Sequence, residues 1–199
     1  MKLNWAERWV VNNPLRAFQQ RMEITWFKRT MPLKPGTTIL EIGCGRGAGA
    51  DLILRAFHPS RLHILDLDAE MIQKAGAFLA EAPGDRLMMY VADSVNLPFK
   101  TETADAVFGF GFLHHVPEWR SALSEIARTL KPGGIYYMEE LYPELYQNAL
   151  TKRILLHPEH DRFSSNDLRN ALDESGLRLT GTFELKKMGI LGVAVKSPA

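Results

Sequence analysis

The sequence has little cysteine, no long apolar run and no excess of charge of one sign, and each absence excludes a class of protein. Its 199 residues include one cysteine, so disulfides within the chain are excluded and a reducing, cytoplasmic location is expected. No apolar run reaches the roughly 20 residues that cross a bilayer, and the first residues lack the apolar core of a signal peptide, so no stable membrane insertion is expected. The 24 basic and 23 acidic residues give no basic footprint for nucleic acid.

The composition that remains is that of an ordinary globular domain. Hydrophobic residues make up 46% of the chain and charged residues 24%, which is enough apolar material for one sizeable core. We therefore expect a single domain over residues 1–199. Its parts are a helical cap, a cofactor-binding core, a substrate-facing insertion, and a closing helix with a β-hairpin (1–35, 36–140, 141–163 and 164–199).

Alternating glycines form the most informative segment of the chain. They follow Thr38–Ile42, an apolar and β-branched stretch that contains Glu41 and predicts a buried strand. Gly43, Gly45 and Gly47 allow a turn that side chains would block, and they let a ligand lie close to the backbone. Apolar residues at helical spacing come next. A strand, a glycine turn and a helix predict the nucleotide-binding corner of an open α/β sheet.

The glycine pattern alone leaves two cofactors open. Gly43, Gly45 and Ala48 also satisfy the dinucleotide fingerprint in its GxGxxA form. The alternation Glu41-x-Gly43-x-Gly45-x-Gly47 instead resembles motif I of the class I S-adenosylmethionine-dependent methyltransferases. In that family the loop passes beneath the methionine and ribose of the cofactor.

Polar residues after two further predicted strands fit the same family. The strand over residues 62–66 ends at Asp66, where the family has an acid that accepts hydrogen bonds from both ribose hydroxyls. A carboxylate suits this role because it carries only acceptors. The strand over residues 86–91 is followed by Asp93 and Ser94, in a segment that resembles the family's D-x-x-x-L-P-F motif. There the acid receives the adenine amino group and the next backbone N–H meets a ring nitrogen.

Two later segments have no counterpart in the dehydrogenase fingerprint. Residues 113–117 (Leu-His-His-Val-Pro) follow a fourth predicted strand, and residues 130–134 (Leu-Lys-Pro-Gly-Gly) end a helix and turn into a fifth. Both are commonplace in small-molecule methyltransferases. The matches run from about residue 39 to 138 in the family's order. In the wording of its motifs the chain resembles the broad group around the ubiquinone- and menaquinone-biosynthesis methyltransferases (methyltransferase type 11).

The resemblance implies a fold, a cofactor and a set of binding residues. The fold is an α/β, Rossmann-like doubly wound sheet of seven strands, mostly parallel with one antiparallel strand at the C-terminal end, and helices on both faces. The cofactor is S-adenosyl-L-methionine and the partner is a small-molecule methyl acceptor. Residues assigned to the cofactor are Glu41, Gly43, Cys44, Gly45, Gly47, Asp66, Leu67, Met71, Asp93, Ser94, Gly109 and Phe110.

Methyl transfer from a sulfonium leaves little bond chemistry to the protein. Most of the catalysis is expected from holding acceptor and methyl group in line in a dry pocket, and a base is needed only where the acceptor must lose a proton. His115 and then His114 are the candidates, because histidine titrates near neutrality; a purely structural role is the alternative. Tyr142 and His157 are weaker candidates. No metal site is expected, because a proline between His157 and His160 spoils their helical spacing.

The N-terminal region predicts an amphipathic helix. Asn13 is a favourable cap and Pro14 a favourable first helical residue. The apolar side of this helix carries four residues at three- and four-residue steps, which we expect to pack on the sheet (Leu15, Phe18, Met22 and Trp26). A substrate lid and a contact with a membrane surface are the alternatives.

Two other functions stay open on sequence grounds. An NAD-dependent oxidoreductase fits the glycine pattern, although the length and the later motifs disfavour it. A non-catalytic S-adenosylmethionine-binding protein would keep the cofactor site and have its acceptor pocket closed by Phe110, Phe112 and Tyr142.

Overall fold

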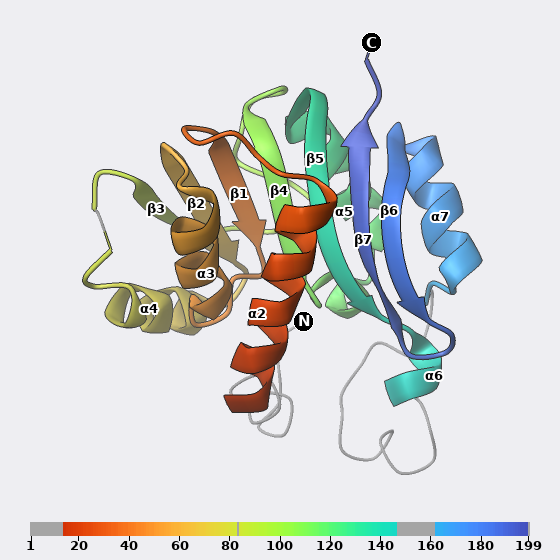
Figure 1. The fold of residues 1–199 in the computed structure, drawn as a ribbon, viewed down its shortest axis with the longest axis horizontal. Coiled ribbons are helices and arrows are strands. Elements are labelled where there is room, and N and C mark those ends of the chain that lie inside the picture. Colours follow the sequence, from red (N-terminus) through yellow and green to blue (C-terminus); the bar gives the residue numbers. More distant parts are fainter. Residues whose placement is uncertain (1–13, 83, 147–161, 199) are drawn as a thin grey trace.

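A computed structural model of the chain describes residues 14–82, 84–146 and 162–198. Its centre is a seven-stranded sheet made of β1 (Thr38–Ile42), β2 (Arg61–Asp66), β3 (Leu87–Val91), β4 (Ala104–Phe110), β5 (Leu130–Leu141), β6 (Leu177–Leu185) and β7 (Gly189–Lys196). The strand order is β3-β2-β1-β4-β5-β7-β6 (Figure 1). Strands β1 to β5 pair in parallel, and β7 runs antiparallel to both of its neighbours. The predicted sheet is confirmed.

Helices cover both faces of the sheet, as predicted. On one face lie α2 (Pro14–Thr30), α3 (Ala48–Phe57) and α4 (Ala69–Phe78), whose buried side chains share one apolar cluster. On the other face lie α5 (Trp119–Thr129) and α7 (Ser165–Glu174). Figure 1 shows α2 lying across the sheet in front, with α5 and α7 behind. Two short helical turns, η1 (Leu113–His115) and α6 (Pro143–Tyr146), follow β4 and β5.

Local sequence signals set the starts of two helices. The Asp68 side chain accepts a hydrogen bond from the Glu70 N–H at 3.1 Å and caps α4. Ser164 and Asp167 form a reciprocal capping box at the start of α7, in which Asp167 accepts the Ser164 N–H at 2.9 Å. Both caps satisfy backbone donors that a helix leaves without partners at its first turn.

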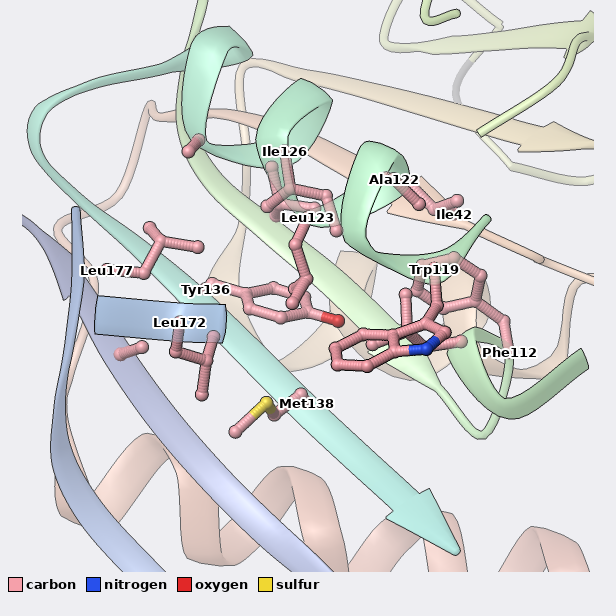
Figure 2. Close-up of a cluster of buried hydrophobic side chains, with 14 of the residues drawn as sticks. Ile42, Phe112, Trp119, Ala122, Leu123, Ile126, Tyr136, Met138, Leu172 and Leu177 are labelled. Carbon is pink, nitrogen blue, oxygen red and sulfur yellow. The ribbon is translucent and has the colours of Figure 1, made fainter. Parts of the chain in front are cut away.

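The apolar cluster on the α5 side forms the floor beneath the turn that follows β4. Figure 2 shows Trp119 and Leu123 of α5 and Leu172 of α7 gathered around Tyr136 and Met138 of β5. All five side chains are fully buried. Phe112 belongs to the same cluster, so the core packing fixes the chain where it leaves β4 and enters η1.

The predicted apolar side of α2 is wrong at Phe18 and Met22, whereas Trp26 is partly buried against the core as expected. The side chain of Leu15 lies outside the described residues. Phe18 and Met22 are 64% and 59% exposed, whereas Ile24 and Phe27 are buried. Phe27 decides the orientation, because its ring lies 5.3 Å from that of Tyr137 and 6.2 Å from those of two phenylalanines of β4. The inward face of the first turns carries polar residues instead, among them the buried Glu23 and Gln20.

The turn predicted before the fifth strand lies within β5. Strand β5 begins at Leu130, and its pairing with β4 shifts register between Ala104 and Ala106. Gly133 has a φ of +75°, so the glycine pair is accommodated as an irregularity in the strand. Of the insertion (141–163), residues 141–146 with α6 and residues 162–163 are described. The side chains of His157 and His160 lie outside the described residues.

Candidate functional site

A cleft of about 840 Å³ opens at the carboxyl ends of the parallel strands. It is lined by the glycine loop after β1 (residues 43–49), one side of α2, the turn after β4, the end of β5 and the β6–β7 hairpin. The strand order reverses between β1 and β4. This reversal is the place where open α/β sheets bind their ligands.

The glycine loop is shaped by three left-handed residues. The φ angles are +70° at Gly43, +52° at Gly45 and +89° at Gly47, values that other L-residues rarely adopt. A Cβ at Gly43 would lie 2.6 Å from the Phe112 Cβ, and one at Gly47 would lie 2.8 Å from the Leu79 side chain. Nothing lies within 4 Å of a Cβ at Gly45. Gly43 and Gly47 therefore fix the packing of the loop, and Gly45 leaves its backbone open on the cleft side.

Glu41 is a buried carboxylate at the floor of the cleft. Its side chain is 1% exposed, and a Cβ at Gly49 would come within 2.1 Å of its Oε1. Among the described residues, Oε2 has no hydrogen-bond partner. Burial, together with the nearby Asp66 carboxylate, raises the pKa of Glu41 to about 8. Gly49 is the residue that lets this carboxylate lie under the loop.

The raised pKa of Glu41 makes the fold less stable at alkaline pH. In the unfolded chain this carboxyl ionises near 4.5 and in the folded chain near 8, so between these values the folded state binds more protons and stability falls as pH rises. We expect Glu41→Gln to reduce the loss of melting temperature between about pH 5 and pH 8 by roughly 5 °C or more. Thermal unfolding of both proteins at the two pH values measures this. An equal loss in the two proteins would contradict it.

Asp66 stands at the end of β2, where the sequence predicts a ribose ligand. Its Oδ2 accepts the Gly45 N–H at 3.0 Å and its Oδ1 accepts the Asp68 N–H at 2.9 Å. Each carboxylate oxygen can accept a second hydrogen bond. Burial raises the pKa of Asp66 and the two backbone N–H groups oppose that rise. The carboxylate is thus fixed in place, joined to the glycine loop, and still able to accept from a diol.

Five of the predicted cofactor residues, Asp66 among them, lie around the ends of β2 and β3, outside the cleft lining. Leu67 and Asp93 are exposed, whereas Met71 and Ser94 are buried. The two strands are parallel neighbours, so their ends lie at one edge of the sheet beside the glycine loop. The assignment of the other four residues to the adenine end of a cofactor stays a prediction.

Gly109 and Phe110 at the end of β4 have different roles, because Phe110 contacts the cleft and Gly109 contacts the core. Phe110 lines the cleft. A Cβ at Gly109 would lie 2.5 Å from Cε1 of Phe112 and 3.1 Å from the Tyr136 hydroxyl. Core packing therefore requires a glycine at position 109.

Cys44 has the properties of a structural residue. The thiol is buried in the loop, and burial with the neighbouring Glu41 and Asp66 carboxylates raises its pKa far above the ordinary value. The group stays protonated, and a protonated thiol is a poor nucleophile. Arg46, the other side chain of interest in this loop, lines the cleft.

The two histidines of η1 both line the cleft and have different surroundings. His114 is 2% exposed, and its Nδ1 lies 2.8 Å from Oε2 of Glu140. Burial lowers the pKa of His114 to about 4, so the ring is neutral at neutral pH. Glu140 also accepts the backbone N–H groups of Leu113 and His114, at 3.0 and 3.2 Å. His115 is partly exposed, and its ring centroid lies 4.2 Å from that of His114.

A buried ionic cluster on the other side of the cleft was missed by the sequence reasoning. Arg16 of α2 contacts Glu23 of the same helix at 3.2 Å and Glu139 of β5 at 2.7 Å. The seven-residue spacing of Arg16 and Glu23 places them on one face of a helix, which was the available signal. Nothing in the sequence showed that this face meets β5.

The cleft is not closed in the way that a non-catalytic protein would require. Phe110 lines it, but Phe112 and Tyr142 pack in the cluster on the α5 and α7 side of the sheet. The Tyr142 hydroxyl donates to Glu184 at 2.6 Å. Tyr142 follows Leu141, which lines the cleft, and successive side chains of an extended chain point to opposite faces. The structure therefore also removes Tyr142 as a candidate base.

Residues 14–82, 84–146 and 162–198 contain no candidate for a metal site or a membrane span. No three or more His, Cys, Asp or Glu side chains in these ranges are grouped to hold a metal ion. No helix in these ranges combines the length and apolar character needed to cross a membrane.

The strand order and the cleft at the switch point of the sheet are those of the Rossmann-like α/β class. A family model described as a methyltransferase domain matches residues 40–138. The chain is 34% identical over 151 residues to a phthiotriol/phenolphthiotriol dimycocerosates methyltransferase of Mycobacterium tuberculosis, covering 71% of this chain and 53% of the relative. It is 33% identical over 109 residues to a fatty-acid O-methyltransferase of Mycolicibacterium smegmatis, covering 54% and 38%. The chain thus spans about half the length of the first of these relatives and a smaller share of the second.

Solved structures show the same fold at low identity. An S-adenosylmethionine-dependent methyltransferase of Mesorhizobium loti has a TM-score of 0.72 and 19% identity, covering 86% of this chain and 96% of its own. A geranyl diphosphate methyltransferase solved with S-adenosylmethionine has a TM-score of 0.75 and 17% identity, covering 92% and 86%. The chain belongs to the class I S-adenosylmethionine-dependent methyltransferases, and its membership removes the dehydrogenase alternative.

Proposed function

We propose that this protein transfers the methyl group of S-adenosylmethionine to a small acceptor that has a polar head and an apolar tail. The observation that carries the proposal is the continuity of the cleft. One cavity joins the glycine loop and Glu41 to polar side chains at the end of β5 and then to apolar side chains of the β6–β7 hairpin. Donor and acceptor sites in one cavity are what a direct transfer requires.

The residues present fit S-adenosylmethionine. The unpartnered Oε2 of buried Glu41 is an acceptor suited to the ammonium group of a methionine moiety. Asp66 is positioned to accept from the ribose diol, and Gly45 leaves the loop backbone open. Arg46 lines the cleft and is suited to the methionine carboxylate. When bound, the cofactor supplies a methyl group activated by a sulfonium, with a neutral thioether as the leaving group.

The chain itself contributes positioning, exclusion of water and control of protons. The glycine loop and α2 enclose the cleft from two sides, which favours alignment of the reacting atoms. His115 is partly exposed at the cleft and is our candidate for accepting a proton from the acceptor. His114 is held by Glu140 at 2.8 Å and keeps the turn after β4 in position. This division of roles follows from their different burial.

The apolar part of the cleft suits a hydrocarbon tail. Met22 of α2 faces it from one side, and the β6–β7 hairpin supplies the other side (Phe183, Leu185, Met188, Ile190 and Leu191). Four of these six side chains are about half exposed or more, which is unusual for large apolar residues unless they meet a ligand or partner. The related enzymes include a sterol methyltransferase and a fatty-acid O-methyltransferase, which supports a lipophilic acceptor.

A substitution on the hairpin tests the tail site. Phe183→Ser should raise the KM for a long-chain acceptor about three- to tenfold and leave that for a short-chain analogue unchanged, because burial of the remaining half of a phenyl side chain contributes about 0.7–1.4 kcal/mol. Phe78→Ser on α4 is the matched control, since Phe78 is 55% exposed against 53% for Phe183. Equal effects of the two substitutions, or equal effects on both acceptors, would contradict the proposal.

A further inference from the structure

Arg16 is shared by two carboxylates where α2 meets the end of β5. Its Nη1 lies 3.2 Å from Oε1 of Glu23, and its Nη2 lies 2.7 Å from Oε2 of Glu139. Gln19 adds a hydrogen bond from Nε2 to the same Glu23 Oε1 at 2.7 Å. The Glu23 and Glu139 side chains are 3% and 7% exposed, so this is a buried cluster.

One oxygen of this cluster lacks a donor. Oε1 of Glu23 receives hydrogen bonds from both Arg16 and Gln19, whereas Oε2 of Glu23 has no partner among the described residues. A buried acceptor without a donor is costly, and natural proteins retain few of them. Glu23 lines the cleft, so a molecule bound in the cleft is in position to supply the donor.

The cluster lies beside the turn after β4, where our proposed function places the transfer of the methyl group. A Cβ at Gly111, which follows β4, would be 3.0 Å from Oε2 of Glu139, 3.5 Å from Cε1 of His114 and 3.7 Å from Nη2 of Arg16. These residues line the cleft with the glycine loop on one side and the apolar hairpin on the other. The cluster therefore faces the position that our proposed function gives to the polar head of the acceptor.

We propose that Glu23 selects acceptors whose reacting head is a hydroxyl or amino group, which donates a hydrogen bond to its free oxygen, and rejects acceptors with a carboxylate head. This inference rests on the proposed function, because it names the acceptor class of the same site. Residue 23 lies outside the segment matched by the methyltransferase family model. The selection is therefore a property of the α2 segment of this chain.

Charge explains the rejection of carboxylates. The Arg16 guanidinium is already engaged by Glu23 and Glu139, and Glu140 is the next residue along β5. Burial and the neighbouring Glu139 raise the pKa of Glu23 to about 7, against the opposing effect of Arg16. Above that pH, a carboxylate head would place its oxygens against the ionised Glu23, with like charges in contact and no donor between them. A hydroxyl or amino group presents a hydrogen in the same place and satisfies the buried acceptor.

Binding of two probes of equal chain length tests this selection. Decan-1-ol and decanoate are titrated into the protein saturated with S-adenosylhomocysteine, and we expect the alcohol to bind at least about tenfold more tightly, the scale of one hydrogen bond to a charged group. Glu23→Gln presents an amide N–H₂ in place of the free oxygen and should reduce or reverse the ratio. Glu70→Gln, in an exposed pair on α4 whose Glu70 side chain is 49% exposed, should leave the ratio unchanged.

Each result has one interpretation. The inference is overturned if the unmodified protein prefers decanoate or shows no preference. It is also overturned if the Glu23→Gln variant has a melting temperature close to that of the unmodified protein and the same ratio of the two affinities. The affinity of the same proteins for S-adenosylmethionine is measured separately. If the unmodified protein does not bind S-adenosylmethionine, the proposed function is overturned. If it binds S-adenosylmethionine but shows no preference for decan-1-ol over decanoate, only the inference is overturned.

Discussion

Glu140→Ala is expected to destabilise the fold by about 3–5 kcal/mol, which is the cost of breaking a fully buried polar network from one side. Glu140 is fully buried and holds the Leu113 N–H at 3.0 Å, the His114 N–H at 3.2 Å and His114 Nδ1 at 2.8 Å, together with the Phe112 N–H. Removing the carboxylate leaves these groups buried without partners, each at a cost of about 1–3 kcal/mol. The turn that carries both histidines would lose its attachment to β5.

Thermal and urea unfolding measure this effect. For a chain of this size the expected fall in melting temperature is roughly 6–20 °C. Glu140→Gln is the matched control, because an amide keeps one acceptor oxygen and nearly the same shape, and it should lose less stability than the alanine variant. An alanine variant as stable as the unmodified protein would show that these hydrogen bonds do not hold the turn.

Asp66→Ala is expected to weaken S-adenosylmethionine binding by about 1.5–3 kcal/mol, or roughly 10- to 150-fold in Kd. The carboxylate is held by the Gly45 and Asp68 N–H groups at 3.0 and 2.9 Å, so it is already in place for the ribose and needs little reorganisation. Its loss also releases the Gly45 N–H and loosens the glycine loop. Both effects weaken binding of the cofactor and leave binding of the acceptor unchanged.

Calorimetric titration with S-adenosylhomocysteine and S-adenosylmethionine measures the loss. Asp51→Ala provides the control, because Asp51 pairs with exposed Arg55 on α3 and should leave both affinities unchanged. If Asp66→Ala bound either ligand as tightly as the unmodified protein, Asp66 would not be the ribose ligand.

The sheet was predictable because its strands carry local signals. Thr38–Ile42 and the strand ending at Asp66 are apolar and β-branched runs bounded by turn residues, and the observed β1 and β2 have nearly the same limits. The closing β-hairpin expected within residues 164–199 corresponds to β6 and β7, and Lys187 in the turn between them has a φ of +63°. The Asp68 side chain caps α4 by accepting the Glu70 N–H, which is a role that aspartate favours directly before a helix.

The position of the glycine loop could be predicted from the sequence, but the role of each glycine could not. The alternation predicts a turn that a ligand approaches. The structure adds that Gly43 and Gly47 are required by the side chains of Phe112 and Leu79, which are distant from them in sequence. Such packing reasons depend on contacts between elements, which spacing along one chain does not contain.

The side of α2 that faces the sheet was not predictable from periodicity. The helix has little amphipathic character, because Phe18 and Met22 stand on one side while Phe27 and the charged pair of Arg16 and Glu23 stand on the other. The side of α2 that faces the sheet is determined by the packing of Phe27 in the aromatic cluster and by the ion pair of Arg16 with Glu139 on β5. The partners Arg16 and Glu139 are 123 residues apart, so only the folded chain brings them together.

Parallel titration of the purified protein with S-adenosylmethionine, S-adenosylhomocysteine and NAD tests the central claim most directly. The unpartnered Glu41 oxygen, the fixed Asp66 carboxylate and the open glycine loop predict binding of the first two ligands in the micromolar range and none of NAD. Binding of NAD alone would contradict the assignment of the cofactor and, with it, the roles proposed for the acceptor side of the cleft.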